Sequence, residues 1–232
     1  MNDYTISVSL AILRAARTHS AENDLRKYLN GVFLDTKAGK VVATDGHRLF
    51  CAHARGVKID APPVIVPNET LDAAFKQFNG DYARGKMLGN ADVLITVRGS
   101  FLTIATPSGQ VSGTSLDGNF PEWRRVVPTA ENVGEYVPAV CNYEYISDAC
   151  DAVVIARNKT KKAAREHAVK IYYRGEFPAI VHDGNADVFA IVMPMRNEIH
   201  SETHLVACRM AHEDALPYSE ETRAHIAEPV AA

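Results

Sequence analysis

The chain has 232 residues, of which 47% are hydrophobic and 23% charged, so it is long enough to bury the core of one or two domains. Its formal net charge of −3 excludes a protein that is basic over its whole surface, and any contact with DNA therefore requires a local basic face. The sequence contains no apolar run near the roughly 18 residues of a membrane helix, and its N-terminus does not resemble a signal peptide.

The four cysteines are scattered, and no two of them form a Cys-x-x-Cys pair. This spacing argues against a zinc site or a disulfide framework and fits the reducing cytoplasm. We therefore expect a cytoplasmic protein with no metal, no cofactor and no membrane partner. The residues concerned are Cys51, Cys141, Cys150 and Cys208.

The first 60 residues predict a strand, a helix and then three strands. Residues 4–8 alternate as a strand does, and Ser9 can cap a helix that runs to about residue 18. Leu10, Leu13 and Ala16 then recur at helical spacing. The strands that follow are expected at residues 29–35, 40–44 and 48–54, with a turn at 37–39.

Residues 43–49, Ala-Thr-Asp-Gly-His-Arg-Leu, predict a tight hairpin between the last two of these strands. Gly46 can supply a positive φ, and the side chain of Asp45 can bond its own backbone. Taken alone, the stretch indicates only a surface hairpin.

The same order of elements starts again after Pro62-Pro63. A strand is expected at residues 64–66, followed by a helix that Asn68 can cap. The apolar face of that helix would carry Leu71, Ala74, Phe75 and Phe78. Further strands are expected at 93–97, 101–106 and 110–116, which makes an internal repeat of about 60 residues.

A third copy starts at Tyr136-Val137, and its helix has the clearest apolar stripe in the chain. Asn142 is the expected cap, and the stripe consists of Ile146, Ala149, Cys150, Val153 and Val154. Strands are expected at 169–173, 179–182 and 188–192. Strands that follow a single helix in each repeat favour an α+β fold with about three strand–helix–strands units.

Two further stretches stand out beside the hairpin. One is Phe120-Pro121-Glu122-Trp123-Arg124-Arg125-Val126, which carries the sole tryptophan, and the other is Met193-Pro194-Met195-Arg196. The three stretches together resemble the bacterial DNA polymerase III beta subunit family, the replicative sliding clamps. That family carries a Thr-Asp-Gly-His-Arg-Leu hairpin, a Phe-Pro-acidic-aromatic-Arg-Arg-Val linker and a terminal Met-Pro-Met-Arg, in this order.

The resemblance implies the DNA-clamp fold and a shortened chain. Clamps of the family are rings of six similar domains, each made of two strand–helix–strands halves, and helices line the hole. Residues 1–127 resemble the complete middle domain, and residues 128–196 contain the second half of the last domain. We expect residues 197–232 to form a C-terminal tail of low order, whereas chains of the family end just after Met-Pro-Met-Arg.

The resemblance also implies a pocket that takes short hydrophobic peptides, often with a Gln and a Leu-Phe pair, from DNA polymerase and the clamp loader. Two adaptable methionines and an arginine rim suit such a pocket. Matched residue by residue, its walls are Thr44, Gly46, His47, Arg48, Leu49, Pro121, Arg125, Val126, Val192, Met193, Pro194, Met195 and Arg196.

Contacts to double-stranded DNA would be made to phosphates and would not depend on sequence. The candidate residues are Arg14, Arg17, Lys76, Arg157, Lys159, Lys161, Lys162 and Arg165. Solvated helix surfaces and helix ends account for such charges at least as often as nucleic acid does. Because most of the ring is missing from one chain, we also expect a homo-oligomer.

Catalysis is not expected. Asp45, His47 and a serine could be imagined as a hydrolytic set, but the sequence contains no Gly-x-Ser-x-Gly elbow and no His-x-x-x-His pair on a helix. Two functions remain open: a sliding clamp assembled from several copies, and a decoy or adaptor that captures clamp-binding peptides without encircling DNA.

Overall fold

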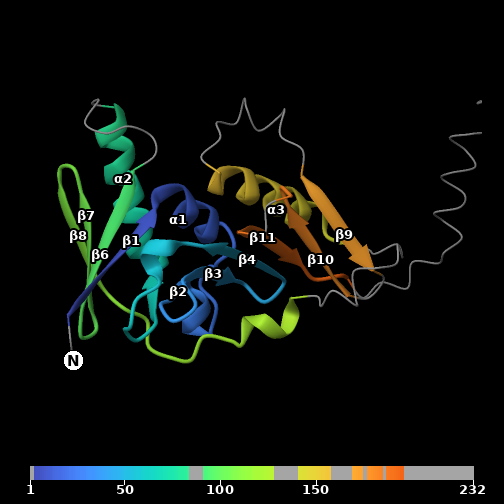
Figure 1. The fold of residues 1–232 in the computed structure, drawn as a ribbon, viewed down its shortest axis with the longest axis horizontal. Coiled ribbons are helices and arrows are strands. Elements are labelled where there is room, and N and C mark those ends of the chain that lie inside the picture. The colour runs from blue at the N-terminus through green and yellow to red at the C-terminus, as the bar shows by residue number, and fades with distance from the viewer. Residues whose placement is uncertain are drawn as a thin grey trace, which may run out of the picture. The chain divides into compact units, whose positions relative to one another are not determined.

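The computed structural model describes residues 3–83, 91–127, 141–157, 169–174, 177–184 and 187–195. The chain divides into a unit spanning Met1–Met195 and a second spanning Arg196–Ala232, and all described residues belong to the first. Figure 1 shows its helices and strands. A boundary near residue 127 stays a prediction, and the start of the third copy and the tail lie outside the described residues.

The first two copies of the repeat form the expected elements. The first copy contains β1 (Tyr4–Ser9), α1 (Leu10–Arg17), β2 (Gly31–Asp35), β3 (Lys40–Thr44) and β4 (Arg48–His53). The second contains β5 (Val64–Pro67), α2 (Asn68–Ala83), β6 (Asp92–Arg98), β7 (Phe101–Thr106) and β8 (Gly109–Thr114). Short 3-10 turns at Lys27–Leu29 (η1) and Arg55–Val57 (η2) lie in the first copy, and a third, η3 (Trp123–Val126), lies in the linker.

The third copy contains α3 (Tyr143–Ala156), β9 (Lys170–Arg174), β10 (Phe177–His182) and β11 (Val188–Val192). Its strands continue the sheet of the first copy, because β11 pairs antiparallel with β4. The described strands thus form a seven-stranded sheet in the order β5-β2-β3-β4-β11-β10-β9 and a four-stranded sheet in the order β1-β6-β7-β8.

The main hydrophobic core lies between the helices and the inner faces of both sheets. Leu13 of α1, Leu71 of α2 and Val153 of α3 are fully buried there, against strand residues such as Phe50. Strand residues alternate between the two faces of a sheet, so their neighbours point away from the helices. Figure 1 shows η3 on the side of the seven-stranded sheet opposite α1 and α3.

The helix starts differ in part from the expected caps. Asn142 does cap α3, because its Oδ1 accepts a hydrogen bond of 2.8 Å from the backbone N–H of Glu144. Ser9 precedes α1 without a side-chain cap bond. Asn68 does not serve as a cap: its Oδ1 accepts from Ser20 and its Nδ2 donates to the carbonyl of Ala21, at 2.8 Å each. Its buried amide therefore ties α2 to the loop after α1.

Helices packed on two sheets whose described strand pairs are all antiparallel make the fold α+β, as expected. Within the part of the chain that the structure describes, none of the helices has the length and hydropathy to span a bilayer.

Candidate peptide-binding site

The hairpin at residues 44–48 is held by its own side chains. Gly46 has φ +94°, a value that favours glycine. Asp45 Oδ1 accepts hydrogen bonds from the backbone N–H groups of His47 at 2.9 Å and Arg48 at 3.0 Å. The hydroxyl of Thr44 accepts from Gly46 N–H and donates to the carbonyl of Arg48. The turn expected from the Asp-Gly pair is therefore present.

The Met-Pro-Met segment lies directly beside this hairpin. β11 pairs with β4 in a register that places Ile191 opposite Leu49 and Val192 opposite Arg48. The pairing continues past the end of β11, because the backbone N–H of Met193 donates to the carbonyl of His47 at 2.8 Å. Two stretches about 145 residues apart in the chain are thus adjacent in one sheet.

The linker packs on the outer face of the same strands. Trp123 is buried against a second apolar cluster, in which Leu49 and Ile191 are fully buried and Val126 is half-buried. The guanidinium of Arg124 lies 4.3 Å from the centre of the Trp123 ring and pairs with Asp35 at 2.9 Å. Hairpin, linker and final strand therefore meet on one face of the seven-stranded sheet.

The candidate peptide-binding residues divide between the two faces of that sheet. Leu49 and Val126 belong to the outer cluster, whereas Val192 belongs to the main core beneath the helices. The alternation of β11 puts Ile191 on the outer face instead, and matching by sequence missed it. The strand period supplies that signal: Ile191 lies directly opposite Leu49 across the two strands.

The remaining candidates lie around the outer cluster or away from it. Thr44 is buried within the hairpin, and Met193 and Pro194 are half-buried. The exposed candidates are Gly46, His47, Pro121, Arg125 and Met195. Arg196 lies outside the described residues.

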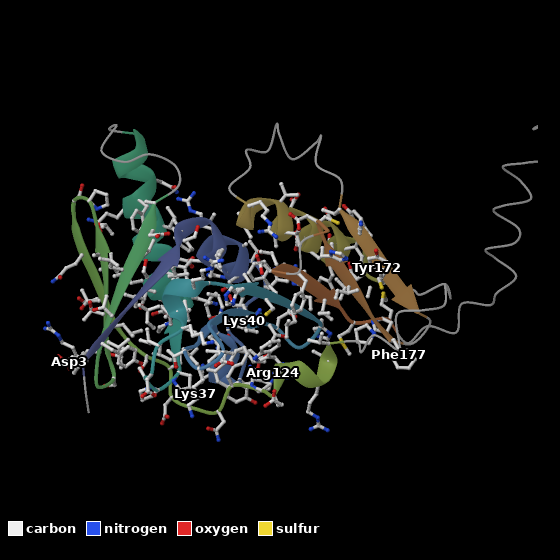
Figure 2. The ribbon with its side chains drawn as sticks, viewed as in Figure 1. Asp3, Lys37, Lys40, Arg124, Tyr172 and Phe177 are labelled. Carbon is white, nitrogen blue, oxygen red and sulfur yellow. The ribbon has the colours of Figure 1, made fainter. Side chains whose placement is uncertain are left out.

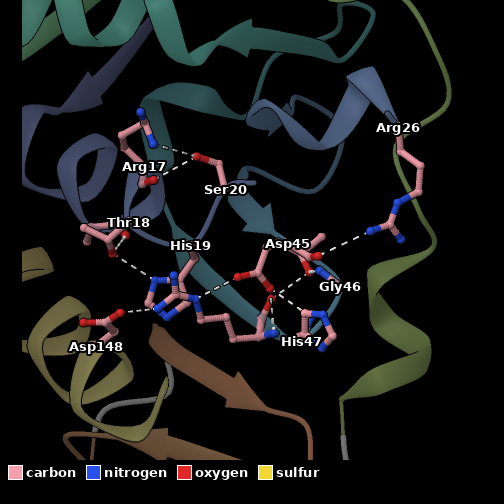
Figure 3. A network of polar contacts seen from close by, with 12 residues as sticks. Arg17, Thr18, His19, Ser20, Arg26, Asp45, Gly46, His47 and Asp148 are labelled. Carbon is pink, nitrogen blue, oxygen red and sulfur yellow. Dashed lines mark hydrogen bonds and ion pairs between the residues drawn. The ribbon is translucent and has the colours of Figure 1, made fainter. Parts of the chain in front are cut away.

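Arg48 points to the helix side and joins the first and third copies. Its guanidinium pairs with Asp45 at 2.9 Å and with Asp148 of α3, and it lies 4.9 Å from the centre of the Tyr145 ring. The ring of His47 stacks on the same tyrosine at 6.0 Å. Figure 3 shows Asp45, His47 and Asp148 at this junction. Arg48 therefore stabilises the interface between the copies and does not rim the outer face.

His19, also drawn in Figure 3, is fully buried next to this junction. Its Nδ1 lies 3.0 Å from the hydroxyl of Thr18, while its Nε2 has no hydrogen-bond partner. Burial, and next the positive charge of Arg48, lower the pKa of His19 to about 4. The imidazole is therefore neutral at physiological pH. Its ring centre lies 5.8 Å from that of Phe50.

The described candidates for DNA contact are mostly held by other side chains. Arg14 donates to Asn79 at 2.5 Å, and Arg17 pairs with Glu22 at 2.6 Å and Asp72 at 2.7 Å. Arg157, at the end of α3, pairs with Asp183 at 2.9 Å. Lys76 is exposed on α2. Lys159, Lys161, Lys162 and Arg165 lie outside the described residues.

Two hollows lined by described residues lie elsewhere, and none of the candidate peptide-binding residues lines them. A groove of about 1050 Å³ lies between β5 and β8, with Leu116 and Phe120 in its wall. A smaller and more polar one, of about 550 Å³, lies near the start of α2. Among the residues with described positions, no group of His, Cys, Asp and Glu is arranged to hold a metal ion.

No protein-family model matches the sequence. The curated beta sliding clamp of Escherichia coli K12 is 30% identical over 135 residues, which are 56% of this chain and 34% of that protein. The beta sliding clamp of Pseudomonas aeruginosa is 36% identical over 115 residues, 47% of this chain and 28% of that protein. Over about half of its length, the chain is similar in sequence to the bacterial beta sliding clamps.

Solved structures agree on the fold. A DNA polymerase sliding clamp from Pseudomonas aeruginosa covers 83% of this chain with a TM-score of 0.53 and 21% identity, and 67% of that structure is matched. The pol III beta of Caulobacter crescentus covers 84% with a TM-score of 0.58 and 19% identity, again with 67% matched. The fold is thus the expected clamp fold, but the chain spans only about a third of the length of these two curated clamps.

Proposed function

We propose that this chain is a non-catalytic, sliding clamp-like accessory protein of DNA replication, and that it binds short hydrophobic peptides on the outer face of its seven-stranded sheet. The supporting observation is that the hairpin, the linker and the Met-Pro-Met segment converge there although they are distant in sequence. The names of the relatives, all beta sliding clamps, support a role in replication rather than catalysis.

The chemistry of this face suits a peptide with apolar side chains. Leu49, Ile191 and Val126 form an apolar base beside Trp123. Met193 and Met195 follow directly, and methionine adapts its shape to irregular apolar partners. Exposed Arg125 can bond the carbonyls or a carboxylate of the peptide. The partners would be a DNA polymerase and a clamp loader in the cytoplasm, each offering a Gln-x-x-Leu-Phe type of segment.

Fluorescence anisotropy with a labelled Gln-Ala-Ala-Leu-Phe peptide tests this proposal. We expect a Kd in the micromolar range, which corresponds to about −8 kcal/mol. The same peptide with Ala-Ala in place of Leu-Phe should bind at least tenfold more weakly. Met195→Glu should weaken binding similarly, because Met195 is 47% exposed and its replacement leaves the core intact.

The matched control is Leu94→Glu. Leu94 is 49% exposed on β6, in the other sheet, so this variant adds the same charge at a similar exposure away from the proposed site. Its affinity should equal that of the wild type. Equal losses in both variants, or normal binding by a folded Met195→Glu variant, would contradict the assignment.

A second candidate function is a decoy or adaptor that captures these peptides without encircling DNA. It is favoured by the short match to the relatives, since the matched residues are only 34% of the Escherichia coli clamp. Retention on DNA separates the two functions. A clamp should stay on nicked circular plasmid during gel filtration and leave after the plasmid is linearised, whereas a decoy should elute free in both cases.

A further inference from the structure

The first and third copies of the repeat meet through their last strands. β4 ends the first copy and β11 ends the third, and the two strands pair antiparallel. The helices of the two copies, α1 and α3, pack side by side at this junction. Ala15 of α1 and Ala152 of α3 are fully buried in the core that they share, and Arg48 pairs with Asp148 across the junction. A last strand and the helix flank beside it thus form one docking surface between copies.

The last strand of the second copy, β8, ends the four-stranded sheet and pairs only with β7 among the described residues (Figure 1). The backbone N–H of Ser115, just after β8, donates to the carbonyl of Ser100 at 2.8 Å. Successive residues of an antiparallel strand direct these groups to opposite sides. Gln110, Ser112 and Thr114 therefore direct their backbone N–H and C=O groups away from β7, toward the open edge.

The β8 edge also lacks the usual protection against pairing. Edge strands are commonly guarded by charged side chains or proline, and β8, Gly109–Thr114, has neither. β9, which ends the seven-stranded sheet, carries Lys170 and Arg174 at its two ends. Of these two edges, β8 is therefore the one that favours a further strand.

The flank of α2 beside β8 corresponds to the flank of α1 that is covered in the first copy. When the fully buried Leu13 of α1 is aligned with the fully buried Leu71 of α2, Ala15 falls at Ala73. Ala15 is fully buried, whereas Ala73 is exposed. A position that the docked third copy buries is thus open in the second copy.

The exposed helix flank and the open strand edge belong to one surface. α2 lies directly over β8, because Gly113 leaves no space for a Cβ beside Thr70. The hollow of about 550 Å³ near the start of α2 is lined by Ala73 together with residues 111–114 of β8. The second copy therefore presents a strand edge with a recess above it, where the first copy is filled by β11 and α3.

We propose that β8 and the adjacent flank of α2 bind the same surface of a second copy of this chain. The two β8 strands pair antiparallel, as β4 and β11 do, and the two α2 helices lie side by side over them. An antiparallel pair of identical strands has a two-fold axis, so each copy completes the edge of the other. The inference concerns assembly and does not depend on peptide binding.

The charges on α2 favour a second copy as the occupant. Glu69 and Lys76 are exposed and lie about one helical turn before and after Ala73. When two antiparallel α2 helices cross at Ala73, Glu69 of each copy faces Lys76 of the other. Asp72 is already paired with Arg17 of α1 and takes no part. The surface is therefore complementary in charge to itself.

Hydrogen exchange with mass spectrometry tests the surface. Amides of β8 should exchange at least tenfold more slowly at about 100 µM than at about 1 µM protein, because dimerisation follows mass action. The control is β9, Lys170–Arg174, whose exchange should not depend on concentration. Light scattering at the higher concentration should give twice the chain mass of 25.4 kDa.

Two variants test the helix flank. Ala73→Glu should abolish the dimer and the protection of β8, because the interface would bury its charge. Its urea unfolding at the lower concentration should match that of the wild type, since Ala73 is exposed in the single chain. Tyr143→Glu is the control: it adds the same charge at the 79% exposed first residue of α3 and should leave the dimer unchanged.

A charge swap identifies the second copy as the partner. Glu69→Lys and Lys76→Glu should each weaken the dimer by roughly tenfold through repulsion between like charges, and the double variant should restore it. A strict monomer at the higher concentration would overturn the proposal, as would a dimer in which β8 exchanges freely. Protection of β8 that is equal at both concentrations would also overturn it, because the edge would then be covered from within the same chain. Failure of the double variant to restore the dimer would contradict the α2 contact.

Discussion

Arg48 on β4 forms an ion pair with Asp148 on α3, although the two residues are 100 positions apart in the chain. The same guanidinium pairs with Asp45 of the hairpin and lies over the ring of Tyr145. One side chain thus links the hairpin to the helix of the third copy. The packing of the third copy against the first should therefore depend on Arg48 more than on an ordinary surface charge.

Replacing Arg48 by alanine should lower the free energy of unfolding by about 2 kcal/mol, because Asp45 would lose the partner of its partly buried carboxylate. Urea unfolding measures this change. Arg98→Ala is the control, since Arg98 and Asp3 form a pair whose side chains are exposed. It should alter stability by less than about 0.5 kcal/mol. Equal losses of stability in the two variants would mean that the Arg48 junction contributes no more than an exposed ion pair.

Trp123 should be important for stability through its volume and not through its N–H group. The ring is buried beside Leu49 and Ile191, while its Nε1 has no hydrogen-bond partner. Trp123→Ala should therefore destabilise the protein by about 3–5 kcal/mol. Trp123→Phe, which keeps an aromatic ring, should cost about 1 kcal/mol in urea unfolding. A large loss in both variants would point to an unrecognised role of the indole N–H.

His19 should make the protein less stable in mild acid. Its pKa is lowered to about 4 in the folded chain from a usual 6.5, so the unfolded state binds the proton more readily between these values. The contribution is fully present above pH 6.5 and is lost as pH falls toward 4. Wild type should lose about 2–3 kcal/mol more than His19→Leu between pH 7 and 4.5. Parallel pH curves for the two proteins, from urea unfolding, would contradict the assignment.

DNA binding, where it occurs, should depend on the basic residues that are not already paired. Arg14, Arg17 and Arg157 are held by neighbouring side chains. The densest basic cluster of the sequence lies at residues 157–165, so we expect charge reversal at Lys159, Lys161, Lys162 and Arg165, which lie outside the described residues, to weaken binding most. The slope of log K against log salt should then become shallower by about 0.9 for each phosphate that the variant no longer neutralises.

Anisotropy with a labelled duplex at several salt concentrations measures that slope. Lys37→Glu is the control, because Figure 2 shows Lys37 on the side of the sheet away from the helices. It should leave the slope unchanged. Sequence-specific binding, or binding that salt does not weaken, would show that another surface is used.

The hairpin and the repeat could be predicted because their signals are local. Asp45 and Gly46 form the expected turn, α1 and α2 each follow a strand, and α3 forms where its apolar stripe indicated. The prediction that Asn68 caps α2 was wrong, because its amide oxygen accepts a hydrogen bond from Ser20. Ser20 is 48 residues away in the chain, and a local capping pattern does not reveal such a partner.

The candidate site depends on pairings that the sequence does not encode locally. Matching motifs placed Val192 and Arg48 in the pocket, whereas the β4–β11 register turns both toward the helices. The same register brings Ile191 to Leu49 on the outer face. A shift of one residue exchanges the two faces of a strand, so the face became clear only from the pairing.

Photo-crosslinking tests the location of the proposed peptide site most directly. A Gln-Ala-Ala-Leu-Phe peptide with p-benzoylphenylalanine in place of the phenylalanine would be irradiated in the presence of the full chain. Mass spectrometry would then locate the attachment sites. We predict attachment within residues 47–49, 121–126 and 191–195, with competition by the unlabelled peptide. Attachment instead to the groove beside Leu116 and Phe120, or only to the helices, would contradict the assignment of this face as the peptide-binding site.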